Sequence, residues 1–188
     1  MPLEKMIGWV RAAERTMRAA VGDHRLRSQI LAEHPGLHLG KWVEIRSPHR
    51  LKLGRNAILE TGVVLHCGGF DWSSDAGGIT LGDDCYIGPN AVLFGSGGIV
   101  AGDNFSVGPG VVIAAQQLTQ YGTPVVPNLP KFAPIRIGNN VSICAHATIL
   151  QGVEIGDFSV IGAGAVVARD IPPHSLAVGI PARVAKQL

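Results

Sequence analysis

The clearest pattern in the chain is an aliphatic residue that returns every six positions, with a smaller residue four places after most of them. An α-helix repeats every 3.6 residues and a half-buried strand every two, so neither element produces this period. A flat turn-and-strand unit fits it, because one large and one small side chain of each unit then point inward and three units close a triangular coil. Repeats of this kind are typical of a parallel β-helix. In the best-formed stretch the aliphatic positions are Ile137, Ile143, Ile149, Ile155, Ile161 and Val167, and the small ones are Val141, Ala147, Val153, Ser159 and Ala165.

The same period upstream predicts that the repeats stack into three inward-facing columns of side chains. The coils should pair in parallel, about 4.8 Å apart. The first column holds Leu53, Leu81, Ala101, Ile137 and Ile155, the second Leu59, Ile87, Val107, Ile143 and Ile161, and the third Leu65, Leu93, Ile113, Ile149 and Val167. The predicted fold is therefore all-β, with a short helical segment before the β-helix and a C-terminal tail after it.

Residues 1–36 differ from the rest, and we interpret them as an N-terminal helical segment that precedes a β-helix domain at 37–188. Their apolar residues follow helical spacing from Met6 to Val21, with arginines largely off that stripe. Such a segment covers the open end of a solenoid and hides unpaired strand edges. The alternative is that this basic amphipathic helix contacts an anionic membrane surface.

Two interruptions of the repeat predict loops at 67–78 and 116–134. The first is rich in Gly, Ser and Asp, and the second carries four prolines. A long loop on a rigid scaffold is usually functional or disordered, so the second is a candidate for part of a binding site.

Composition narrows the function classes. The 188 residues are 46% hydrophobic but only 5% aromatic and include 25 glycines, which suits a single domain with a narrow core. A net charge of +2 without a basic run argues against nucleic acid as a partner. The three cysteines, Cys67, Cys85 and Cys144, have neither metal-site spacing nor the even count of a disulfide framework. This cysteine pattern suits a reducing compartment, so we expect a cytoplasmic protein. No stretch reaches the roughly 18 apolar residues of a transmembrane helix, so we expect no transmembrane segment.

The C-terminal run IGAGAVVARDIPPHSLAVGIPARV, which begins at Ile161, resembles the ending of the hexapeptide-repeat acyltransferases. The resemblance covers roughly Leu53 to Lys186 and is specific to the sugar O-acetyltransferase branch, with its maltose, galactoside, nodulation and exopolysaccharide enzymes. It implies a left-handed β-helix, a homotrimer and grooves between subunits that bind acetyl-coenzyme A, or another acyl-coenzyme A, as a co-substrate. The implied acceptor is a carbohydrate hydroxyl, as in the synthesis of surface polysaccharides.

The same resemblance assigns a set of residues to the coenzyme groove. Small side chains let a thin pantetheine arm lie against the backbone, and basic side chains pair with phosphates. The assigned residues are Ala145, Ala163, Ala168, Arg169, Arg183 and Lys186.

The catalytic base is missing from its expected place. The family's His, which removes the proton from the attacking hydroxyl, aligns with Leu118, and leucine cannot accept a proton. Loss of a positioned general base typically costs roughly 10²–10⁴-fold in rate. His146, beside Ala145, and His66, at the start of the first loop, are the candidate substitutes. Cys144 is better explained as a small packing residue, and no histidines have the spacing of a zinc site.

Two other functions stay open because of Leu118. One is N-acetylation of an amino sugar, since a free amine is nucleophilic once deprotonated and depends more on positioning than on a strong base. The other is a non-catalytic trimeric scaffold that kept the fold.

Overall fold

The computed structural model describes residues 27–68, 77–117 and 131–188. The chain divides into two units, Met1–Pro35 and Gly36–Leu188. In the first unit, the described residues 27–33 are helical. The apolar stripe from Met6 to Val21, on which the N-terminal helix was predicted, lies outside the described residues. None of the helices in the described part of the chain is long and apolar enough to cross a membrane.

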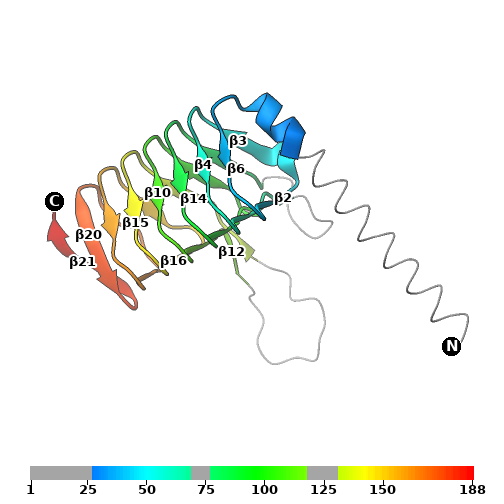
Figure 1. The fold of residues 1–188 in the computed structure, drawn as a ribbon. Helices are drawn as coiled ribbons and strands as arrows, with labels where there is room; N and C mark the ends of the chain where they lie inside the picture. Colours follow the sequence, from blue (N-terminus) through cyan, green and yellow to red (C-terminus); the bar gives the residue numbers. More distant parts are fainter. Residues whose placement is uncertain (1–26, 69–76, 118–130) are drawn as a thin grey trace, which may run out of the picture. The chain divides into compact units, whose positions relative to one another are not determined.

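The second unit is a parallel β-helix, as the six-residue period predicted, and it is of the left-handed kind that the resemblance implied (Figure 1). Successive short strands belong to three different parallel sheets, which we call A, B and C, and the chain passes from A to B to C in every complete coil. Sheet A contains β1 (His38–Leu39), β4 (Ile58–Leu59), β7 (Tyr86–Ile87), β10 (Ser106–Val107), β15 (Ser142–Ile143), β18 (Val160–Ile161), β20 (Ser175–Gly179) and β21 (Ala182–Gln187). Sheet B contains β2 (Glu44–Arg46), β5 (Val64–His66), β8 (Val92–Phe94), β11 (Val112–Ala114), β16 (Thr148–Leu150) and β19 (Val166–Val167). Sheet C contains β3 (Leu51–Leu53), β6 (Ile79–Leu81), β9 (Ile99–Ala101), β14 (Ile135–Ile137) and β17 (Glu154–Ile155).

The register of the sheets confirms all three predicted columns. In sheet A, for example, Leu59 pairs with Ile87, and Ile87 pairs with Val107. The column residues of sheets A and B from Leu59 onward are almost completely buried. Inward-facing aliphatic side chains therefore stack along the coil axis and form the core, while the alternate residues of each strand face outward.

The turns between sheets are held by side chains as well as by backbone. Where the chain passes from sheet C to sheet A, one side chain in each of several successive coils accepts a hydrogen bond from the backbone of a neighbouring coil. Asp83 Oδ1 accepts from Arg55 N at 2.7 Å and Asp103 Oδ1 from Asp83 N at 2.8 Å. Asn139 and Asp157 continue the ladder at 2.9 and 2.7 Å. The ladder fixes the coils relative to one another along this corner.

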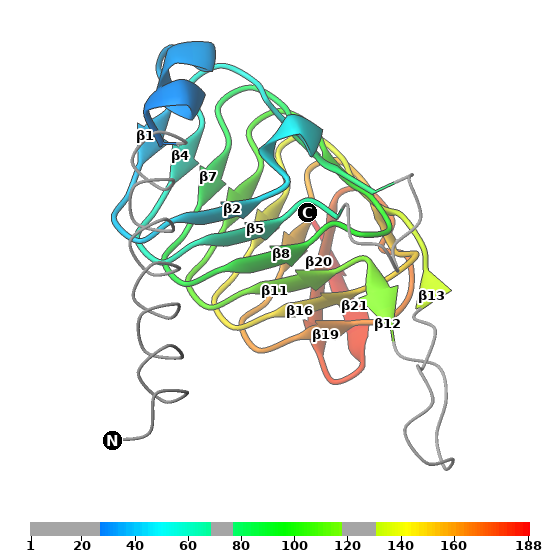
Figure 2. The same cartoon turned by 90° about the vertical axis from the view of Figure 1, so that its right-hand side faces the viewer.

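Both predicted loops leave the β-helix at the corner between sheets B and C (Figure 2). The ends of the second loop differ from the prediction. β12 (Gln116–Gln117) and β13 (Lys131–Phe132) pair antiparallel, so the segment 116–134 begins and ends as a two-stranded ladder instead of as irregular chain. Residues 69–76 and 118–130 lie outside the described residues. The turn Gly95–Gly98 lies between the roots of the two insertions, because Gly77 borders it on one side and Ala115 and Ala133 on the other.

The C-terminal tail continues sheet A as an antiparallel hairpin of β20 and β21. At the other end of the β-helix, the 3-10 turn Pro48–Arg50 connects β2 and β3, the first strands of sheets B and C.

Thiol labelling should distinguish the buried cysteines from Cys144. Burial raises the pKa of the Cys67 thiol to about 12 and also raises the pKa of the buried Cys85. Because the thiolate is the reactive form, both should resist Ellman's reagent in the native protein at pH 8. The half-buried Cys144 should react first, and all three should react in denaturant. Mass spectrometry after limited labelling would identify the sites, and early labelling of Cys67 would contradict this burial.

Candidate functional site

Two of the residues that the resemblance assigns to the coenzyme groove lie at the corner between sheets A and B. Ala145 and Ala163 follow β15 and β18, which pair in register, so they occupy the same place in successive coils. The backbone confirms the stacking, because Gly164 N donates to Ala145 O at 2.9 Å. Ala145 is half-buried and Ala163 is exposed, so a thin ligand has access to the backbone here.

Ala168 and Arg169 lie at the opposite edge of sheet B. They follow β19, directly before the chain turns into sheet C, and both are exposed. Ala168 is five positions after Ala163, and even a fully extended chain of that length would span at most about 17 Å. The structure therefore places the predicted groove residues on two edges of one sheet rather than in one cluster.

The basic pair Arg183 and Lys186 lies on β21, the last strand of sheet A, and both residues are exposed. Arg183 pairs with Val178 in the hairpin register, and its Nη1 donates to Ala182 O at 2.9 Å. Lys186 pairs with Leu176. Both cations are thus available to a phosphate group at the C-terminal end of the coil stack.

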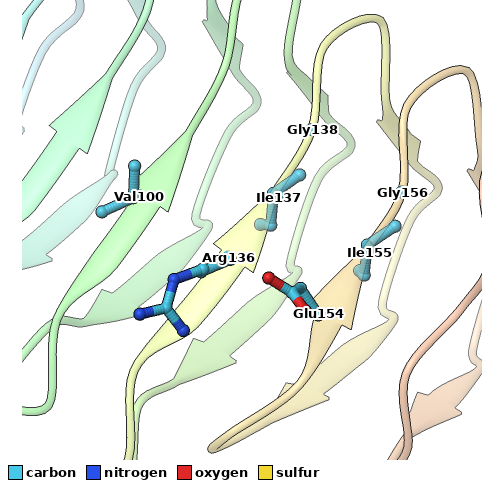
Figure 3. A pocket seen from close by; sticks show the side chains of 7 residues that line it. All are labelled: Val100, Arg136, Ile137, Gly138, Glu154, Ile155 and Gly156. Atoms are coloured by element: carbon cyan, nitrogen blue, oxygen red, sulfur yellow. The ribbon is translucent and has the colours of Figure 1, made fainter.

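Two hollows on the described surface lie away from these residues. A shallow hollow of about 360 Å³ lies on the outward face of sheet C (Figure 3). The side chains of Arg136 and Glu154 line it from neighbouring strands that pair in register. Val100, which is half-exposed, lines it from the next strand. A second hollow of about 360 Å³ continues past Glu154 to Asp170 and Pro173. Neither of these two hollows is lined by a residue assigned to the coenzyme.

His146 stands in the corner between sheets A and B, directly after Ala145. It adopts a left-handed backbone conformation with φ of 57°, and it is exposed. A Cβ atom added to Gly110 would lie 2.6 Å from His146 Nδ1, so the imidazole lies close over the glycine of the neighbouring coil. Gly110 therefore provides the space that the ring occupies.

His66, the other candidate base, is only 7% exposed on the outward side of sheet B. Its Nε2 lies 3.2 Å from Arg46 Nη1, and its ring meets the Phe94 ring edge-on with centroids 5.7 Å apart. A guanidinium only donates, so Nε2 accepts and the neutral tautomer with the proton on Nδ1 is assigned. Burial, followed by the positive charge of Arg46, lowers the pKa of His66 and keeps it neutral. In this arrangement the Nε2 lone pair faces Arg46 instead of an acceptor hydroxyl.

Leu118, at the family's His position, lies outside the described residues, directly after β12 (Gln116–Gln117). Sequence reasoning missed the surroundings of His66, namely Glu44, Arg46 and Phe94. Part of the signal was present in the predicted stacking, because positions 66 and 94 directly follow Leu65 and Leu93 of the third column. Arg46 joins this outward row through the pairing of β2 with β5, which the predicted column did not include. In the described part of the chain, no three His, Cys, Asp or Glu side chains are grouped in a way that could hold a metal ion.

Comparison with known sequences agrees with the repeat pattern. Residues 134–169 match the family model described as bacterial transferase hexapeptide (six repeats), and residues 78–115 match the hexapeptide repeat of succinyl-transferase. The chain therefore contains hexapeptide repeats of the kind found in bacterial transferases. It is 37% identical to galactoside O-acetyltransferase of Escherichia coli (strain K12) over 115 residues, 58% of this chain and 44% of that protein, which confirms the resemblance to the sugar O-acetyltransferase branch.

Other relatives transfer an acyl group to nitrogen. The chain is 46% identical over 59 residues to 2,3,4,5-tetrahydropyridine-2,6-dicarboxylate N-acetyltransferase of Enterococcus faecalis, which is 31% of this chain and 25% of that protein. It spans less than half the length of these curated relatives. Among solved structures, a mutant of AntD, an N-acyltransferase from Bacillus cereus in complex with dTDP and coenzyme A, superposes with a TM-score of 0.69. That match covers 85% of this chain and 88% of AntD at 22% identity, so it supports the fold alone.

Proposed function

We propose that the protein is an acyl-coenzyme A-dependent acyltransferase that transfers an acetyl group to a carbohydrate hydroxyl. In this reaction the acceptor oxygen attacks the thioester carbonyl carbon, the carbon–sulfur bond breaks, and coenzyme A leaves as its thiol. The acceptor proton must pass to a base during the attack. His146 is the candidate of this chain that stands beside a proposed coenzyme position, Ala145, and is exposed.

The observation that carries the proposal is the placement of the six coenzyme candidates on both edges of sheet B and on β21. Ala145 and Ala163 lie at one edge, and Ala168 and Arg169 lie at the other. Both sets can line one groove if two copies of the chain lie side by side. The edge with Ala145 and Ala163 in one copy would then face the edge with Ala168 and Arg169 in the next copy. A head-to-tail contact of this kind can close into a ring, and the ring that the resemblance implies is a homotrimer.

The outward face of sheet B supports such an assembly. From β5 onward it is more apolar than the outward face of sheet C, because it presents valines, Phe94, Ala114 and Leu150 in successive coils. On sheet C the corresponding positions include Lys52, Arg136 and Glu154. Apolar surface that borders a ligand groove favours association between copies.

N-acetylation of an amino sugar is the second candidate function. It is favoured by Leu118, which removes the expected base, and by the Arg46 contact that occupies the His66 lone pair. The similarity to an N-acetyltransferase over 59 residues is consistent with it. Thiol release measured with matched hydroxyl and amino sugars would separate the two functions. A protein that binds acetyl-coenzyme A but releases no thiol with either class would be a scaffold.

Removing the basic pair on β21 should weaken coenzyme binding. The double variant Arg183→Ala/Lys186→Ala should lose about 1–3 kcal/mol of acetyl-coenzyme A binding, because charge-assisted hydrogen bonds to phosphate are lost. Titration calorimetry would measure the loss. The control is Lys52→Ala/Arg136→Ala, which makes the same charge change on exposed residues of sheet C and should leave the dissociation constant unchanged. Equal affinity in wild type and the β21 variant would refute the assignment.

A further inference from the structure

A charged and aromatic cluster interrupts the otherwise apolar outward face of sheet B at its N-terminal end. Glu44 and Arg46 belong to β2, His66 to β5 and Phe94 to β8, and we call these four residues the Arg46 cluster. Arg46 pairs in register with His66, and His66 pairs with Phe94, so three of the four form one outward row. The row continues through Ala114 and Leu150 on the next strands.

The contacts within the Arg46 cluster form a connected chain. Arg46 Nε donates to Glu44 Oε1, and Arg46 Nη1 donates to His66 Nε2 at 3.2 Å. The His66 ring meets the Phe94 ring at 84°, with centroids 5.7 Å apart. The Arg46 and Glu44 side chains are 54% and 48% exposed, whereas His66 is 7% exposed. The Glu44 carboxylate and the Arg46 guanidinium are therefore accessible to solvent. The buried, neutral His66 ring accepts a hydrogen bond from the guanidinium on one side.

The cluster is also tied to the root of the first insertion. Ser47 Oγ donates to Gly68 O at 2.5 Å, and Arg50 Nη1 donates to Gly77 O at 3.3 Å. Gly68 and Gly77 are the described residues on either side of that insertion. These two hydrogen bonds hold the chain that follows Arg46 against the residues on either side of the first insertion.

We propose that the Arg46 cluster binds the pyranose ring of the acceptor. The Glu44 carboxylate accepts hydrogen bonds from ring hydroxyls, and Arg46 donates to hydroxyl oxygens. Phe94 offers an apolar surface to the C–H face of the ring, and His66 is a positioning residue that orients Arg46. Few polar groups at fixed places beside apolar surface are what a specific small-ligand site requires. The assignment rests on the proposed function, since it names the acceptor side of the same site.

The position along the coil stack agrees with this assignment. The proposed coenzyme residues lie in the last coils, at Ala163, Ala168 and on β21. The Arg46 cluster lies on the first three strands of the same sheet, and β11, which leads into the long insertion, lies between the two groups. A role in stability alone explains the cluster poorly, because an exposed ion pair contributes little to folding.

Saturation-transfer NMR on the full chain tests the assignment without requiring turnover. The probes are methyl pyranosides of glucose, galactose, glucosamine and galactosamine. Arg46→Gln and Phe94→Leu should each weaken binding of the preferred sugar roughly tenfold, the ratio for one lost charge-assisted hydrogen bond or its equivalent. The control is Arg55→Gln, which removes another exposed arginine paired with a carboxylate, that of Asp83, at a different corner. It should bind sugar like wild type.

Acetyl-coenzyme A calorimetry on the same variants separates this inference from the proposed function. Unchanged coenzyme affinity with weakened sugar binding in Arg46→Gln supports the cluster. Sugar binding that is equal in Arg46→Gln, Phe94→Leu and wild type overturns it, as does a wild type that binds none of the sugars. A wild type that binds sugar through the cluster but does not bind acetyl-coenzyme A would keep this inference and reject the proposed function. Thermal unfolding of each variant verifies that the protein is folded.

Discussion

Gly97→Ala is expected to reduce the free energy of unfolding by about 3 kcal/mol, at the upper end for an overpacked interior. A Cβ atom at this position would lie 2.1 Å from Ala115 O and 2.9 and 3.0 Å from Ala133 N and O. These neighbours are backbone atoms at the root of the long insertion, so no side chain can move aside. Urea unfolding followed by circular dichroism would give the change.

The matched control is Gly164→Ala in another corner of the β-helix. Nothing lies within 4 Å of a Cβ atom built there, and the remaining cost is the left-handed φ of 66°. That conformation costs an ordinary residue about 1 kcal/mol. If Gly97→Ala proved no less stable than Gly164→Ala, the close approach of the insertion root to the turn Gly95–Gly98 would be wrong.

The fold could be predicted from the sequence because the inward positions obey a strict period. A shift by one residue would turn Leu59 or Ile113 out to solvent, so hydrophobic burial alone selects the register. Every pairing within the three predicted columns is present in the structure, from Leu53 with Leu81 to Ile149 with Val167. The period also predicted where the insertions leave the coil.

The ends of the long insertion and the Arg46 cluster could not be predicted in the same way. Gln116 and Gln117 pair with Phe132 and Lys131 as strands, although nothing in their spacing resembles the repeat. That pairing depends on where the two ends of the insertion leave the scaffold. The Arg46–His66 contact joins outward residues, whose identities the core does not constrain.

The residues of the candidate coenzyme site were predicted one by one from the resemblance. Their positions relative to one another became known only from the structure. Ala145 and Ala163 could be placed in one corner by repeat counting, and the structure has them there. That Ala168 and Arg169 lie across sheet B from them follows from the three-sheet coil. The site that we propose to be shared between copies would leave no complete pattern within a single chain, because its two halves would meet only after assembly.

Leu118→His is expected to raise the rate of hydroxyl acylation tenfold or more if the protein is an O-acetyltransferase that lacks its usual base. A positioned general base contributes roughly 10²–10⁴-fold, so restoring one at the family's position should recover part of that range. Coenzyme A thiol release with a hydroxyl sugar would measure it. Leu118→Gln is the control for polarity and size, and it should not raise the rate because an amide does not accept a proton at neutral pH.

Variants of His146 and His66 show how an unchanged rate in Leu118→His should be interpreted. If His146 or His66 already acts as the base, Leu118→His should change little, while His146→Ala or His66→Ala should abolish turnover. An N-acetyltransferase should keep its activity in all three variants, and its rate should rise with pH as the amine acceptor loses its proton. The Arg46 contact and lowered pKa of His66 make His146 the more accessible base of the two. We therefore expect His146→Ala to reduce O-acetylation more than His66→Ala does, and equal losses would place the base elsewhere in the chain.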